Sequence, residues 1–284
     1  MKLSNPNANI FIPDSIPEPE ALARTTHLGI GAHQDDLEFM AFQGIIACYH
    51  NGTEWFSGVT CTDGAGSAHT GPYEKCTADE MRAIRANEQN LAAEIGRYGA
   101  MVQLGHTSAA AKDPYGTALR DDLLAILRAT RPRVVYTHNP ADKHDTHIGV
   151  MVAAIEAMRA LPPEDRPSEV YGCEGWRNLD WMPDDEKIVH NVGGHENLAA
   201  TLNGVFDSQI AGGKRYDLGV IGRRRMNAVF FESHAVDRSD SVAFAMDLTP
   251  LVKDATLDIP SYVDAIVTRF RNDVQTRLRT RLGR

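Results

Sequence analysis

The chain has 284 residues, of which 43% are hydrophobic, and its 29 lysines and arginines face 38 aspartates and glutamates, for a net charge of −9. This length suits one large α/β domain with a sizeable core, and the acidic balance argues against nucleic acid as a partner. Residues 1–24 have neither the basic flank nor the apolar stretch of a signal peptide. We therefore expect a cytoplasmic protein with no membrane partner and an irregular N-terminal segment over 1–24.

The predicted elements alternate between strand and helix over the first 160 residues. The strands are expected at 26–32, 54–62, 100–104 and 133–137. The helices are expected at 37–49, 77–95, 119–129 and 148–161. The helix at 77–95 is predicted to begin with a capping box formed by Thr77 and Glu80. This alternation predicts parallel pairing with right-handed crossovers, and hence a three-layer α/β/α sandwich with a Rossmann-like, mostly parallel sheet. A dinucleotide site is excluded because Gly29-Ile30-Gly31 is not followed by the third glycine of that motif.

The second half of the chain is expected to complete the same domain. Strands are predicted at 170–178, 187–192 and 228–231, and a helix at 195–209. The tail over 262–284 is interpreted as an amphipathic, arginine-rich helix that is solvated or packed on the body. We do not divide the chain at the turn-rich segment 162–167, so residues 25–284 form a single domain, with 165–284 as its more variable, substrate-side part.

The four cysteines indicate no disulfide framework. They are few for this length and show no Cys-x-x-Cys spacing, which also argues against a cysteine-rich zinc site. We expect most of them to be small buried hydrophobic residues. The four are Cys48, Cys61, Cys76 and Cys173.

Two polar clusters follow predicted strands. His33, Asp35 and Asp36 follow the strand at 26–32, and the segment 138–147, with three histidines, follows the strand at 133–137. Ligands collect at the carboxyl ends of the strands in open α/β sheets. Each cluster alone is weak evidence, because an Asp-Asp pair before a helix is most often an N-cap and its neighbour. Their conjunction at two parallel strand ends predicts one metal site.

The residue types match a catalytic zinc site, which takes three nitrogen or carboxylate ligands and leaves one position open. We expect His33, Asp36 and His147 to be the ligands, although iron(II) shares these donors. Asp35 is then free to act as the general base that removes a proton from water.

His144 is expected to assist the reaction without binding the metal. Its i, i+3 spacing from His147 at the start of a helix directs both rings to one cavity. A free histidine can stabilise a developing oxyanion or protonate a leaving amine, because its pKa lies near working pH. Asp142 or Asp145 could hold it in the required tautomer.

At these residues the chain resembles the PIG-L or LmbE-like zinc-dependent N-deacetylases, which include enzymes of mycothiol and bacillithiol synthesis that act on N-acetylglucosamine conjugates. The resemblance covers about the first 160 residues well. The matching segments are Ala32-His33-Gln34-Asp35-Asp36 for the family's Ala-His-Pro-Asp-Asp, the threonine-and-glycine loop 62–66, Arg85-x-x-Glu88 and His144-x-x-His147, with a weaker match at 206–209.

The resemblance implies the same ligands, base and assisting histidine as the residue-level reasoning, and a small-molecule acetylated amino sugar as substrate. It also implies that Arg85 contacts the polar aglycone, whereas from the sequence alone an ion pair with Glu88 on a solvated face is equally reasonable. Two positions depart from the family. Gln34 replaces a proline, which puts the rigidity of the turn in doubt, and Thr146 replaces an aspartate that could orient the free histidine.

The C-terminal third is where specificity is expected to be set. His234 follows the apolar run 229–231 and is a candidate for the cavity rim, although a satisfied strand-end histidine is more common. Asp145 is a further candidate substrate contact. Tyr171, Trp176 and Trp181 could stack on a sugar ring, but aromatic residues near prolines pack loops more often.

The leading hypothesis is a zinc-dependent hydrolase that removes an acetyl group from an N-acetylglucosamine-type conjugate. Two alternatives stay open. One is an amidase acting on another acylated amine or a thiol conjugate, and the other is a non-catalytic metal- or sugar-binding relative silenced by the change at Thr146. A homo-oligomer is possible.

Overall fold

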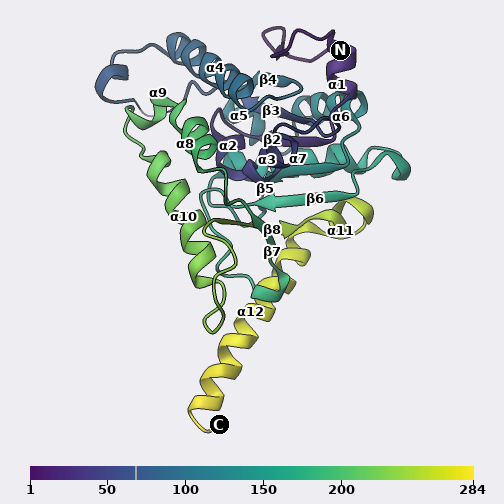
Figure 1. The fold of residues 1–284 in the computed structure, drawn as a ribbon. Helices are drawn as coiled ribbons and strands as arrows, with labels where there is room; N and C mark the ends of the chain where they lie inside the picture. The colour runs from purple at the N-terminus through teal and green to yellow at the C-terminus, as the bar shows by residue number, and fades with distance from the viewer. Residues whose placement is uncertain (68) are drawn as a thin grey trace.

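The computed structural model describes residues 1–67 and 69–284, which form an eight-stranded sheet covered by helices on both faces (Figure 1). Five neighbouring strands, in the order β4-β3-β2-β5-β6, are parallel, and β1, β8 and β7 extend the sheet through antiparallel pairs. The predicted α/β class is confirmed. In chain order the strands are β1 (Asn9–Phe11), β2 (His27–Gly31), β3 (Phe56–Thr62), β4 (Met101–His106), β5 (Val134–His138), β6 (Glu169–Cys173), β7 (Ile188–Asn191) and β8 (Val242–Asp247).

The helices form two layers, each with its own apolar cluster against the sheet. One layer contains α1 (Glu18–Ala23), α5 (Ser108–Ala111), α6 (Ala118–Thr130), α7 (Asp145–Arg159) and α11 (Thr249–Lys253). The other contains α2 (Asp36–Met40), α3 (Phe42–Cys48), α4 (Ala78–Ile95) and α8 (Glu196–Gly204), followed by α9 (Asp207–Ile210) and α10 (Tyr216–Phe230). Short 3₁₀ turns lie at Gly71–Tyr73, Pro163–Asp165 and Asp184–Glu186.

The C-terminal helix α12 (Ile259–Arg281) is anchored at its start and then projects away from the body (Figure 1). The Tyr262 hydroxyl donates to the Asp247 carbonyl at 2.6 Å, and Arg269 pairs with Glu186. No helix among the described residues has the length and apolar character needed to span a membrane.

Several predicted elements differ from those observed. The segment 1–24, predicted to be irregular, contains the edge strand β1 and the helix α1. The predicted helix 37–49 is broken at Ala41, and the predicted helix 195–209 is divided into α8 and α9. The predicted strand 228–231 is wrong, because these residues end α10 and Phe230 is 80% exposed.

The strand order places the two polar clusters side by side. From β2 the chain continues to β3 and β4 on one side of the sheet, whereas from β5 it continues to β6 on the other. Between β2 and β5 the direction of the crossovers therefore reverses, and such a switch point opens a crevice at the carboxyl ends of the strands. His33 follows β2, and the segment 139–147 follows β5, so both clusters line this crevice.

Candidate metal centre

The turn after β2 is tight and its backbone is strained. All five residues of β2 are buried, and a Cβ on Gly31 would lie 3.0 Å from the Asp36 Cβ, so glycine lets α2 start close to the strand. The backbone of Asp35 has φ = 101°, which residues other than glycine rarely adopt. The Asp35 amide donates to Gln89 Oε1 at 3.1 Å, which helps to hold it there. Strain of this kind is often found at functional sites.

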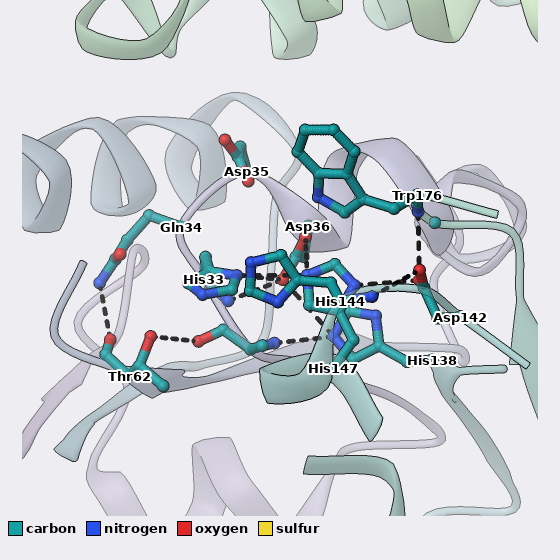
Figure 2. A network of polar contacts seen from close by, with 12 residues as sticks. His33, Gln34, Asp35, Asp36, Thr62, His138, Asp142, His144, His147 and Trp176 are labelled. Carbon is teal, nitrogen blue, oxygen red and sulfur yellow. Dashed lines mark hydrogen bonds and ion pairs between the residues drawn. The ribbon is translucent and has the colours of Figure 1, made fainter. Parts of the chain in front are cut away.

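The three predicted ligands converge on one point (Figure 2). His33 Nδ1 lies 3.3 Å from His147 Nε2 and 3.3 Å from Asp36 Oδ2, while His147 Nε2 lies 3.5 Å from Asp36 Oδ1. Donors bound at about 2.0–2.1 Å from a tetrahedral metal ion are separated by roughly 3.3–3.4 Å. The spacing of these three donors therefore fits a tetrahedral metal centre with one open position.

Asp142 orients His147 rather than His144, which corrects the predicted role of this aspartate. Asp142 Oδ2 lies 3.0 Å from His147 Nδ1 and accepts from the Trp176 amide at 3.1 Å, while Oδ1 accepts from the Lys143 amide at 2.6 Å. Burial opposes ionisation of Asp142, but the hydrogen bond and charge of His147, together with His138 and the Lys143 amide, hold its pKa below its usual value. The ionised carboxylate keeps the His147 proton on Nδ1, which leaves the Nε2 lone pair free for a metal.

We expect Asp142→Asn to weaken metal affinity by about 10- to 100-fold, because the amide cannot hold His147 in the metal-binding tautomer as strongly. Competition against a chelating dye would measure this. Asp145→Asn, at an exposed position three residues further along, is the matched control and should leave the affinity unchanged. Equal affinity in both variants would show that Asp142 has no part in metal binding.

His138 is a member of the cluster to which the sequence assigned no role. Its side chain is fully buried, its ring stacks on His147 with centroids 3.8 Å apart, and its Nε2 accepts from the Ala32 amide at 2.9 Å. Burial lowers the pKa of His138 to about 4, so the ring is neutral. A second donor set, His138, Asp142 and His147, is also compact. We favour the first set, because His138 Nε2 and both Asp142 oxygens already take part in hydrogen bonds, whereas in the described part of the chain only one Asp36 oxygen, Oδ2, accepts one.

Asp35 and His144 both line a cavity of about 610 Å³ above the cluster. In Figure 2, the Asp35 carboxyl and Trp176 lie on the same side of the histidines. Burial raises the pKa of Asp35 well above its usual value, although the guanidinium of Arg85, 3.5 Å away, opposes the shift. The His144 ring centroid lies 5.0 Å from that of His33, and burial followed by its histidine neighbours lowers its pKa. Among the described atoms, His144 Nδ1 has no hydrogen-bond partner.

The two departures from the family pattern have different surroundings. Gln34 is buried, and its Nε2 donates to the Thr62 carbonyl at 3.1 Å and to Gln103 Oε1 at 3.3 Å, so the side chain ties the turn to β3 and β4. Thr146 is buried and lines the cavity in the first turn of α7.

Arg85 supports the turn from inside the protein. It is 3% exposed and donates to the Gln34 carbonyl at 2.6 Å and to the Gly64 carbonyl at 3.3 Å. The alternative of an exposed pair with Glu88 is wrong, because Glu88 instead accepts from the Ser208 amide and hydroxyl at 2.7 and 2.6 Å. Arg85 lines the cavity, so its predicted contact with substrate stays a proposal.

Two predicted substrate contacts lie outside this cavity. Asp145 is exposed at the start of α7, and His234 is exposed in the loop after α10 because the strand expected before it is a helix. Neither is among the described residues that line the cavity. Of the three candidate aromatic residues, Trp176 lines the cavity, whereas Tyr171 packs on Tyr136 within the sheet and Trp181 packs against the core.

The sequence did not indicate that α10 forms one wall of the cavity. Five of its residues line the cavity at i, i+3, i+4, i+7 and i+8 spacing, and Lys214 precedes them. This spacing is visible in the sequence once the segment is recognised as a helix. The five are Tyr216, Gly219, Val220, Arg223 and Arg224.

The fold and the cluster together define a Rossmann-like α/β protein with a histidine–carboxylate centre at a topological switch point. Residues 28–158 match the family model PIG-L, described as GlcNAc-PI de-N-acetylase. The match covers 131 of the 284 residues, and the resemblance predicted from the sequence is confirmed. No curated protein matches the chain significantly.

Solved structures show the same fold at low sequence identity. The N,N'-diacetylchitobiose deacetylase of Pyrococcus horikoshii is 19% identical with a TM-score of 0.58, covering 82% of this chain and 88% of its own. The conserved protein TT1542 of Thermus thermophilus is 18% identical with a TM-score of 0.60, covering 78% and 93%. GalB, the 4-carboxy-2-hydroxymuconate hydratase of Pseudomonas putida, is 15% identical with a TM-score of 0.57, covering 79% and 95%. The fold thus also occurs in a hydratase.

Proposed function

We propose that this protein is a metal-dependent hydrolase that removes the acetyl group from an N-acetylated amino sugar conjugate. The observation that carries the proposal is the convergence of His33, Asp36 and His147 beneath a cavity that Asp35 also lines, within the segment that matches the de-N-acetylase family model. The N,N'-diacetylchitobiose deacetylase of similar fold supports the same class of substrate.

The three converging residues would hold the metal, and zinc or iron(II) fits these donors. A divalent ion bound there would polarise the acetyl carbonyl and lower the pKa of a water molecule. Asp35 would accept the proton of the attacking water, since its carboxylate lies in the cavity and is not one of the converging donors. His144 would donate a hydrogen bond to the carbonyl oxygen and a proton to the departing amine, for which a ring in the cavity wall is well placed.

The test is an assay of the metal-loaded protein with N-acetylglucosamine glycosides, in which acetate and free amine are both quantified. We expect equimolar release of the two, and loss of turnover after chelation. Turnover restricted to other amides or to thiol conjugates would replace the sugar substrate. Stoichiometric metal without turnover of any acylated amine would favour a binding protein, and hydration of an unsaturated carboxylate would favour chemistry like that of the hydratase.

A further inference from the structure

The outer part of α12, residues 267–284, forms an arm that is exposed on all sides. Ile266 is the last buried residue of the helix, and every residue from 269 to 284 is exposed. The arm projects away from the body (Figure 1). It contains poor helix formers such as Phe270, Asn272 and Val274, and a helical segment of about 15 residues is only marginally stable alone in water. A surface that covers the arm would therefore stabilise it.

The arm carries an apolar stripe along one side. Its large apolar residues are spaced three, four, four and four positions apart, which keeps them within roughly 120° of the helix circumference. None of them packs against the two apolar clusters of the described chain. An exposed apolar surface bordered by polar groups is typical of an interaction site. The five residues, each between 36% and 65% exposed, are Val267, Phe270, Val274, Leu278 and Leu282.

The stripe is nearly symmetric about Val274. Phe270 and Leu278 lie four residues before and after it, and Val267 and Leu282 lie seven and eight residues away. When two copies of α12 pack antiparallel with Val274 against its counterpart, Phe270 of each copy meets Leu278 of the other. Val267 then lies beside Leu282. A two-fold interface requires such self-complementarity, because residue i meets residue j and j meets i.

The distribution of charge favours a second copy of this chain as the partner. The segment 259–284 has six arginines and two aspartates, for a net charge of +4, whereas the whole chain carries −9, so the other 258 residues carry −13. The arm of one copy is therefore attracted to the body of another. A basic amphipathic helix can also bind an anionic membrane surface, but here the acidic body would be repelled by that surface.

The antiparallel register also brings opposite charges together. The turn at 184–186 consists of three acidic residues and forms an ion pair with the start of the arm. In the symmetric register, Arg279 and Arg281 of the other copy lie level with the start of the arm, near this turn. Along one edge of the stripe, Asp273 of each copy lies within one helical turn of Arg277 of the other. The charges therefore support the pairing that the apolar residues indicate.

We propose that the arm is a dimerisation element, in which α12 of one copy packs antiparallel against α12 of a second copy through the apolar stripe. The proposal does not depend on the proposed function. One helix face from each copy is a smaller interface than that of a permanent dimer, so we expect a dissociation constant on the order of 10 μM. The two bodies then lie at opposite ends of the helix pair.

Sedimentation equilibrium of the full chain, at concentrations above and below this constant, measures the association. Val274→Glu places two like charges against each other at the two-fold axis and should weaken the dimer by at least about tenfold. Thr276→Glu is the matched control, because it adds the same charge on the opposite side of the helix and should leave the association unchanged. A monomer at every concentration, or equal association of the two variants, would overturn the proposal.

Cross-linking tests the orientation of the two helices. Phe270→Cys and Leu278→Cys are made in a Cys76→Ser background, since the other three cysteines are buried. With a short bismaleimide, a mixture of the two variants should give products that join one variant to the other, as identified by mass. Joining of each variant only to itself would indicate parallel helices and overturn the antiparallel arrangement.

A vesicle experiment tests the membrane surface as the other occupant. Vesicles of phosphatidylserine and phosphatidylcholine are floated with the unmodified protein and with Val274→Glu. We expect no binding that depends on Val274. Flotation that Val274→Glu abolishes, together with a monomer in solution, would assign the stripe to an anionic membrane surface and overturn the dimer.

Discussion

Replacing Asp35 with asparagine is expected to lower kcat by about 10²- to 10⁴-fold while the metal content stays the same, because the amide cannot accept the proton of the attacking water. The substitution is nearly isosteric. Asparagine also tolerates positive φ better than most residues, so the strained turn and the bond from the residue 35 amide to Gln89 should persist. Asp35→Ala would be less informative, since alanine at φ = 101° adds strain to the loss of the carboxylate.

Single-turnover kinetics and metal analysis on the same preparation would measure the effect of Asp35→Asn. Asp121→Asn, at an exposed position on α6, controls for the loss of one negative charge. If Asp35→Asn retains full kcat with unchanged metal, then Asp35 is not the base, and its strained backbone serves only to shape the turn. If the metal is lost as well, then Asp35 acts on the centre itself rather than on water.

The convergence of His33, Asp36 and His147 could be predicted, because part of their spacing is local. His33 and Asp36 are separated by one tight turn after a fully buried strand, and such a strand is readable as a continuous apolar run. The capping box at Thr77 was predicted from the same kind of short-range pattern, and its reciprocal hydrogen bonds are present. The order of the strands brings the second cluster beside the first, as expected for a parallel sheet.

The partners of these ligands could not be predicted, because they depend on how distant segments pack. Successive residues of a helix are rotated by about 100°, so Asp145 faces solvent although His147, two residues later, faces the cavity. Asp142 reaches His147 through a loop whose path is fixed by the amides of Trp176 and Arg177.

The same limit explains the error in the C-terminal third. The run Val229-Phe230-Phe231 has the composition of a strand, but the buried positions Arg224, Asn227 and Ala228 follow helical spacing, and the last strand is β8. Because charged residues occupy the inner face of α10, its amphipathic pattern is not visible by hydrophobicity.

His33→Ala is expected to lower both metal occupancy and activity by roughly 10²-fold or more, because His33 Nδ1 lies 3.3 Å from each of the other two donors and completes the set. His234→Ala should change neither, since His234 is exposed and outside the cavity. The variant His138→Ala distinguishes between the two compact donor sets as the metal ligands. If it leaves the metal bound at one equivalent while His33→Ala does not, His33, Asp36 and His147 are the ligands. The reverse result would assign the metal to His138, Asp142 and His147 and move the open coordination position away from Asp35.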